Sequence, residues 1–276
     1  MSAVRVYEQA MFFVGTSFRR SLTTHNERFP WHQWVRLVYN DALTYDPSTG
    51  TGGVRAAWRH RQFGNSPLNK ALLGYANHLE HLKANESVPF DKCSMADYSV
   101  GAAFTTIQFA EGPVMLDEFA WGRKDATSVE ECGSLDNVPQ PGGYIQRMDG
   151  LGFESNEIVA LASCECFGVH RNAARSRWSS HPKFNNYLYK SLLTQSGAKH
   201  PFHDVFMNNA ATKEHVQNFA ENREEFNLVF KRAFVKLSEL GSESQSLSDV
   251  EHFLHDDVNA KLFYPNEYGN QYGQYN

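Results

Sequence analysis

Residues 154–170, ESNEIVALASCECFGVH, decide how the rest of the chain is interpreted. Polar residues suited to cap a helix open the stretch, and Glu157 lies in the first turn, where a carboxylate suits the helix dipole. Steps of three and four residues place Ile158, Leu161 and Glu165 on one face of this predicted helix. Glu165 therefore stands where an apolar side chain is expected, and it needs a partner or a chemical role.

The composition favours one large folded unit with a small-molecule or protein partner. The chain has 276 residues, 41% hydrophobic and 13% aromatic, which is enough to bury one core or two lobes sharing a cleft. A net charge of -5 with dispersed basic residues argues against nucleic acid or an acidic membrane surface as partner. Without a long apolar run or a basic leader, we expect a cytoplasmic protein. The 4 cysteines are too few for a disulfide framework and are expected to be buried thiols.

Periodic apolar positions predict a protein built almost entirely from helices. Besides 154–170, the predicted helices are a short one within 1–30, then 31–43, 66–83, 95–110, 183–193, 221–240 and 247–260. The helix at 95–110 is apolar nearly all round, which is typical of a central, buried helix. Alternation typical of strands is almost absent, so the predicted fold class is all-α.

Three segments outside these helices carry further predictions. Residues 46–53, DPSTGTGG, have turn chemistry with backbone freedom at their end. The connection 113–142 is long for a structureless loop and is expected to be packed, with GRKD at 122–125 as a structural turn. The tail from about 262 is rich in Tyr, Asn, Gln and Gly, a composition compatible with disorder or with wrapping the surface.

Six segments carry a resemblance when taken together. They are WVRLVYNDALTYDPSTGTGG, MADYSVGAAF, FAWGRKDAT, EIVALASCECFG, FNNYLYKSLL and FKRAFVKLSELG. Their order resembles that of the plant-type haem peroxidases, the branch with ascorbate and cytochrome c peroxidases, from about residue 31 to 241. The resemblance implies two helical lobes with haem between them. It gives a single domain over 1–276, with a distal lobe at about 1–140, a proximal lobe at about 141–245 and an extension at about 246–276.

The resemblance also implies where the family's distal residues fall. The distal Arg falls on Arg36 and the aromatic residue on Tyr39, while the distal His falls on Asn40. Asn65 falls where the family has the Asn that hydrogen-bonds the distal His. Because an amide cannot accept and return a proton near neutral pH, Asn40 cannot act as the distal base.

On the proximal side, the resemblance places the iron-ligating His on Glu165 and its partnering Asp on His203. Glu is not among the usual axial ligands of haem iron. A proximal Trp of some members corresponds to Trp178, and the Arg that holds ascorbate falls near Ala174, so ascorbate is not supported as a substrate. Two losses at the two essential positions argue against ordinary peroxide chemistry.

We therefore expect a haem-independent enzyme that uses acid/base chemistry in the former haem cavity. Glu165 and His203 would form the acid/base pair, and Arg36 would hold a carboxylate or enolate oxygen of an apolar small molecule. Tyr39 and Asn40 complete the predicted site, and the reaction would be a cyclisation, elimination or isomerisation. No cofactor is expected, and a site of Glu165 and His203 alone is too sparse for a metal such as zinc.

Three alternatives stay open at this point. Glu165 and His203 could form a buried structural pair that fills a dead site. The protein could bind haem b with unusual ligation and act as an oxidoreductase. It could also be a non-catalytic pseudoperoxidase that acts through its surface or its tail.

Overall fold

The computed structural model describes residues 32–85, 94–115, 118–166, 184–194, 200–242 and 248–249. Its α-helices are α2 (His32–Ala42), α3 (Arg61–Gly64), α4 (Leu73–Asn85), α5 (Met95–Phe109), α6 (Tyr144–Gly150), α7 (Ser155–Leu161), α8 (Ser163–Cys166), α9 (Tyr187–Thr194), α10 (His203–Met207), α11 (Ala210–Glu221) and α12 (Arg223–Ser238). Short 3-10 helices are η1 (Ala57–Arg59), η4 (Glu130–Cys132), η5 (Leu135–Asn137) and η6 (Pro141–Gly143). The predicted all-α class is confirmed.

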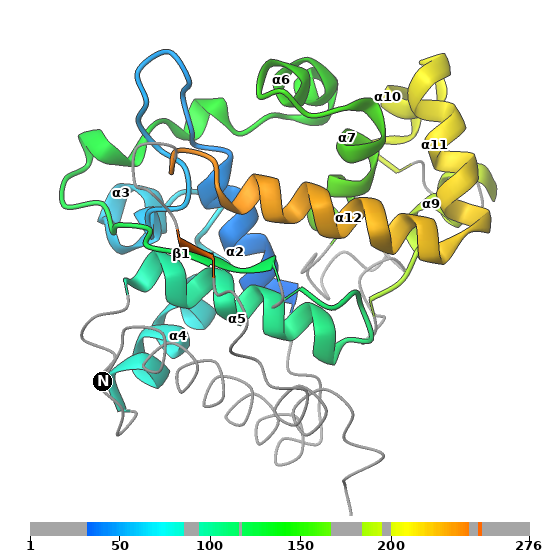
Figure 1. Cartoon of the computed structure of the whole chain (residues 1–276). Helices are drawn as coiled ribbons and strands as arrows, with labels where there is room; N and C mark the ends of the chain where they lie inside the picture. Colours follow the sequence, from blue (N-terminus) through cyan, green and yellow to red (C-terminus); the bar gives the residue numbers. More distant parts are fainter. Residues whose placement is uncertain are drawn as a thin grey trace, which may run out of the picture.

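Helix α12 runs across the middle of the molecule, with α4 and α5 below it and α6 and α10 above it in the view of Figure 1. Helix α2 packs against α5 and also touches α12, α4 and α8, while α12 packs against α7. One hydrophobic cluster runs through these helices. The stripe predicted for residues 221–240, namely Phe226, Phe230, Phe234 and Leu237, is fully buried in it.

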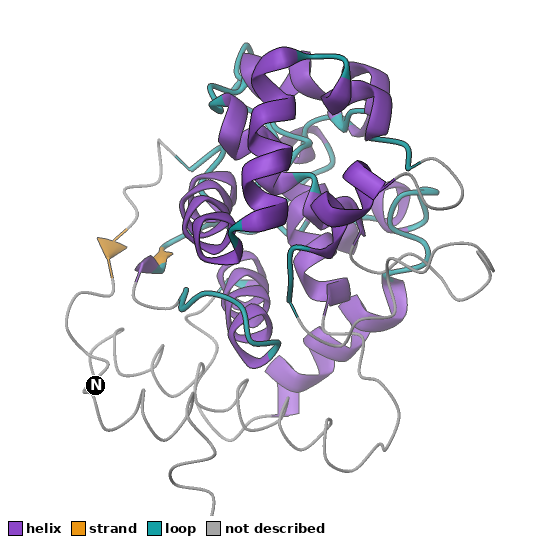
Figure 2. Ribbon diagram, turned by 90° about the vertical axis from the view of Figure 1, so that its right-hand side faces the viewer, coloured by secondary structure: helices purple, strands orange, loops and turns teal. Residues whose placement is uncertain are grey.

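Most predicted helices are present, and two predictions needed correction. The helix predicted at 66–83 begins only at Leu73, because residues 66–72 form turns. The helix predicted at 247–260 is contradicted at Ser248–Asp249, a two-residue strand β2 that pairs antiparallel with β1 (Ala120–Trp121). Figure 2 shows these strands at one edge of the helical body. Two-residue strands depend on a partner far along the chain, so no local pattern predicts them.

Within the decisive stretch, the described residues 154–166 form two consecutive helices. Helix α7 begins after Glu154, whose side chain forms a capping box with Glu157. Helix α7 ends at Leu161, and the short α8 follows, carrying Glu165. Ala162, between the two helices, keeps helical dihedral angles, φ -58° and ψ -22°.

Several predictions fall on parts of the chain outside the described residues. They concern the helix within 1–30, most of 247–260, the tail from about 262, and the positions Trp178 and Ala174. The division into a distal lobe, a proximal lobe and an extension stays a prediction.

Four glycines bring three distant turns into contact. The turn predicted at 46–53 is present, and its end has positive φ at Gly52 and Gly53. Gly133 and Gly241, also at positive φ, meet it from η4 and from the end of α12. Only glycine allows backbones to approach this closely. The backbone freedom predicted for the turn therefore lets it contact segments that lie about 80 and about 190 residues later in the chain.

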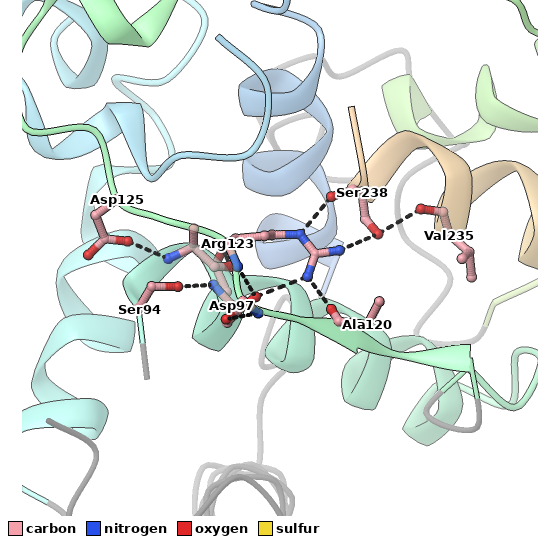
Figure 3. A network of polar contacts seen from close by, with 10 residues as sticks. Ser94, Asp97, Ala120, Arg123, Asp125, Val235 and Ser238 are labelled. Carbon is pink, nitrogen blue, oxygen red and sulfur yellow. Dashed lines mark hydrogen bonds and ion pairs between the residues drawn. The ribbon is translucent and has the colours of Figure 1, made fainter. Parts of the chain in front are cut away.

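Arg123 lies at the centre of a buried polar network that joins the connection 113–142 to two helices (Figure 3). Its guanidinium Nη1 lies 3.0 Å from Asp97 Oδ1 on α5, and its Nε donates to the carbonyl of Ser238 on α12 at 2.7 Å. Asp97 also accepts the backbone N–H of Gly122 at 2.8 Å. GRKD at 122–125 therefore has the structural role that the sequence predicts.

Asp125 closes the other end of this network. Its carboxylate accepts the backbone N–H groups of Met95 and Ala96 at the start of α5, at 3.0 and 2.8 Å. Ser94 caps the same helix through the N–H of Asp97. Within the described ranges, no helix is long and apolar enough to cross a membrane.

Candidate functional site

Helix α2 carries the three predicted residues of the distal wall. Tyr39 and Asn40 are buried, and the Arg36 side chain is 19% exposed. Arg36 and Asn40 lie one helical turn apart, and α2 also touches α8, which carries Glu165. The structure thus brings four of the five predicted site residues onto two helices in contact.

Arg36 and Glu165 form a direct link between these two helices. The Arg36 Nη2 lies 3.1 Å from Glu165 Oε2, and the Arg36 Nη1 donates to the backbone carbonyl of Glu165 at 2.8 Å. The Glu165 side chain is 20% exposed. The carboxylate that the sequence left without a partner is therefore paired with Arg36, 129 residues away in the chain.

His203 does not partner Glu165 among the described residues, and that prediction was wrong. It begins α10, and its Nδ1 lies 3.3 Å from Asp204 Oδ1. Its Nε2 is buried and has no hydrogen-bond partner in the described part of the chain. The resemblance placed His203 beside Glu165 through a segment that diverges from the family's pattern, so its side-chain partner could not be read from the sequence.

Burial and neighbouring charges shift the pKa values at the Arg36–Glu165 link. Burial raises the pKa of Glu165 above its usual value, and Arg36 followed by Tyr39 limits that rise. Burial also raises the pKa of the Tyr39 phenol well above its usual value, helped by Tyr144, Glu165 and Cys164. Tyr39 therefore stays protonated in the folded protein.

Cys164 is a neighbour that the sequence argument set aside. It is fully buried, and it is close enough to Tyr39 to contribute to the rise in the pKa of that phenol. Tyr144 on α6 is a second such neighbour. Cys164 lies within the segment EIVALASCECFG, whereas Tyr144 lies outside the six segments, and the sequence alone did not place either beside Tyr39. The Cys166 side chain lies outside the described residues, as does Cys93.

Asn40 has a different partner from the one predicted. Its Nδ2 donates to Asn69 Oδ1 at 3.0 Å, whereas Asn65 is exposed and lines a shallow surface pocket with Arg61. The resemblance placed this role on Asn65, four residues before the Asn that the structure brings to Asn40. The turns between these two positions bring Asn69 inward instead.

Comparisons with known proteins identify the family of this chain. Residues 14–222 of the 276 match the peroxidase family. The chain belongs to the peroxidase family. It is similar to L-ascorbate peroxidase 5, peroxisomal, of Arabidopsis thaliana, 27% identical over 75% of each chain. It is also similar to the cytosolic L-ascorbate peroxidase 1 of Oryza sativa subsp. japonica, 27% identical over 75% of this chain and 84% of that one. A Yarrowia lipolytica protein provisionally named mitochondrial cytochrome c peroxidase is 27% identical over 75% of this chain and 80% of that one.

The described residues of this peroxidase-family protein do not fit a haem held between Arg36 and Glu165. A flat ring needs van der Waals contact on both faces, which separates the atoms above and below it by about 7 Å. The Arg36 and Glu165 side chains are 3.1 Å apart.

A pH effect on stability is expected from His200, which precedes α10. Its Nδ1 accepts the backbone N–H of Phe202 at 3.2 Å, so this nitrogen must be unprotonated. Burial, then the charge of His203, lowers the pKa of His200 to about 4. Because the folded pKa lies below the unfolded one, this contribution to stability is complete above about pH 6.5 and is lost as the pH falls towards 4.

We expect the free energy of unfolding to fall by about 1 to 3 kcal/mol between pH 6.5 and 4 on account of this group. Urea unfolding of the parent and of His200→Asn at several pH values measures it. The amide oxygen of Asn can accept the same N–H without titrating, so the variant should lose less stability on acidification. Equal losses in both proteins would contradict the assignment.

Proposed function

We propose that this peroxidase-family protein works without haem and uses Glu165, Arg36 and Tyr39 for acid/base chemistry on an apolar small molecule. The observation that supports this most directly is the ion pair between Arg36 and Glu165, at 3.1 Å. By the resemblance, these two residues stand at the positions where the family's chemistry uses an imidazole and an arginine on opposite sides of haem. The reaction would be a cyclisation, elimination or isomerisation in the cytoplasm, with no nucleic acid or membrane partner.

The chemistry follows from the exchange of partners at Arg36. A carbonyl or enolate oxygen of the substrate takes the place of Glu165 Oε2 on the guanidinium, which stabilises negative charge on that oxygen. Glu165 then loses the contact that limits its pKa, so it becomes a stronger base for a proton next to the carbonyl. Tyr39, which is protonated before the reaction, donates its proton in the returning step, and Glu165 then passes the proton it removed to Tyr39, which restores both groups. His203 takes no part, since it pairs with Asp204.

A second candidate is a non-catalytic pseudoperoxidase in which the same ion pair is a structural tie. The hydrogen bond from Arg36 Nη1 to the backbone carbonyl of Glu165, at 2.8 Å, favours it, because acid/base chemistry does not require that bond. The two candidates differ in what the loss of the Glu165 carboxylate should change.

The test has two readouts. The first is the ultraviolet-visible spectrum of protein expressed with ample haem supply, where we expect no Soret band at about 400 nm. The second is the exchange of hydrogen for deuterium next to the carbonyl of phenylacetone in D2O, followed by NMR. We expect the parent to accelerate this exchange and Glu165→Gln to lose about 100-fold of the acceleration, as for loss of a general base.

Glu157→Gln is the matched control. Glu157 also forms an ion pair, with Lys236 at 3.0 Å, and Gln keeps the capping role at this position. This variant should accelerate the hydrogen–deuterium exchange of phenylacetone as much as the parent does. Stoichiometric haem would overturn the proposal. No acceleration in the parent, together with a loss of stability in Glu165→Gln, would favour the structural tie.

A further inference from the structure

The side-chain amide of Asn40 has a fixed orientation. Asn69 Nδ2 donates to the backbone carbonyl of Phe63 at 3.3 Å, so Asn69 must turn its Oδ1 towards Asn40. The Asn40 Nδ2 donates to this Asn69 Oδ1, at 3.0 Å. The orientation of this amide therefore follows from a chain of donors that ends on a backbone acceptor.

This orientation leaves the carbonyl oxygen of Asn40 without a partner. The residue is 1% exposed, and its Oδ1 has no hydrogen-bond partner in the described part of the chain. Buried acceptors are normally satisfied, and each exception calls for an explanation such as a ligand or water. An O–H or N–H group is the only kind of partner that satisfies a carbonyl oxygen.

Arg36 lies one turn earlier on the same side of α2 as Asn40. Residues four apart on a helix have Cβ atoms about 5 to 6 Å apart, so one small molecule is able to meet both. Arg36 is the hydrogen-bond donor and cation of the two, and it already binds a carboxylate, that of Glu165. Helix α2 thus carries a carboxylate-binding group, Arg36, beside a hydrogen-bond acceptor, Asn40 Oδ1, that lacks a donor.

We infer that the small-molecule ligand of this site is an apolar 2- or 3-hydroxy carboxylic acid. Its carboxylate replaces that of Glu165 on Arg36, and its hydroxyl donates to Asn40 Oδ1. The short spacing between the two groups on α2 matches the short spacing of hydroxyl and carboxylate in such acids. The inference rests on the proposed function, because it names the ligand class of the same site.

Isothermal titration calorimetry at neutral pH with mandelate, phenylacetate and 1-phenylethanol tests the inference on the full chain. Mandelate carries both groups, phenylacetate lacks the hydroxyl, and 1-phenylethanol lacks the carboxylate. We expect mandelate to bind about tenfold or more tightly than either of the others, since a satisfied buried acceptor contributes a factor of this size. Equal affinities would overturn the inference, and so would no binding of any of the three.

Two variants separate recognition from folding. Asn40→Leu removes the acceptor and should lose the preference for mandelate over phenylacetate. Asn40→His should keep it, because Nδ1–H can donate to Asn69 while Nε2 accepts from the hydroxyl. If Asn40→Leu does not fold, a loss of the preference in Asn40→His overturns the inference by itself. Persistence of the preference for mandelate in Asn40→Leu would also overturn the inference.

The outcome is distinguishable from failure of the proposed function. Phenylacetone has no hydroxyl group, so its exchange depends on Glu165, Arg36 and Tyr39 and not on Asn40. Exchange by the parent without a mandelate preference would overturn the ligand class and leave the haem-independent chemistry standing. Stoichiometric haem would instead overturn the proposed function.

Discussion

Gly53→Ala is expected to lower the free energy of unfolding by about 3 kcal/mol or more, from left-handed strain and steric overlap together. Gly53 has φ +84°, and a Cβ there would lie 2.1 Å from the carbonyl oxygen of Leu240 and 2.9 Å from its carbon. Both are backbone atoms just after α12, so the steric overlap is relieved only if the turn at 46–53 and this segment move apart. Urea unfolding followed by circular dichroism measures the loss.

Gly50→Ala is the matched control on the same turn. Its φ is +69°, but a Cβ there meets nothing within 4 Å. It should cost only about 1 to 2 kcal/mol, which is the left-handed strain alone. Equal losses in the two variants would show that steric contact with α12 contributes nothing.

Arg123→Leu is expected to lower the free energy of unfolding by about 3 to 5 kcal/mol. The Arg123 and Asp97 side chains are 1% and 3% exposed, so the substitution leaves an uncompensated carboxylate in the interior. Burial already raises the pKa of Asp97, and Arg123 is the strongest influence opposing that rise. The variant also loses the bond from Arg123 Nε to Ser238 that ties the network to α12.

Two comparisons check this explanation. Arg59→Ala removes an arginine that is 48% exposed and pairs with Glu80 and Asp125, and it should cost less than about 1 kcal/mol. Adding Asp97→Asn to Arg123→Leu should recover part of the loss, because it removes the stranded charge. If the double variant is no more stable than Arg123→Leu, the cost lies in packing and not in charge.

The sequence was sufficient for features that depend on local pattern. The helices at 31–43, 95–110 and 221–240 follow from apolar periodicity, and α12 buries the stripe that was predicted for it. The glycine-rich end of the turn at 46–53 also follows from local chemistry. Glu165 was recognised as a residue in need of a partner for the same reason.

Features that depend on contacts across the chain could not be predicted. The partner of Glu165 was expected to be His203 and is Arg36, because one sequence does not reveal which of several polar residues a fold brings together. Asn69 was missed because the apolar spacing indicated a helix from residue 66, whereas residues 66–72 form turns. The strand at Ser248–Asp249 exists only through Ala120 and Trp121, more than 120 residues earlier.

The hydrogen bond from Arg36 to the main-chain oxygen of residue 165 has a consequence for protein engineering. A main-chain atom survives every substitution, so Glu165→His alone would leave α2 tied to α8. A designer who wants to install a metalloporphyrin here must therefore also release Arg36 from that carbonyl, so that the two helices can separate.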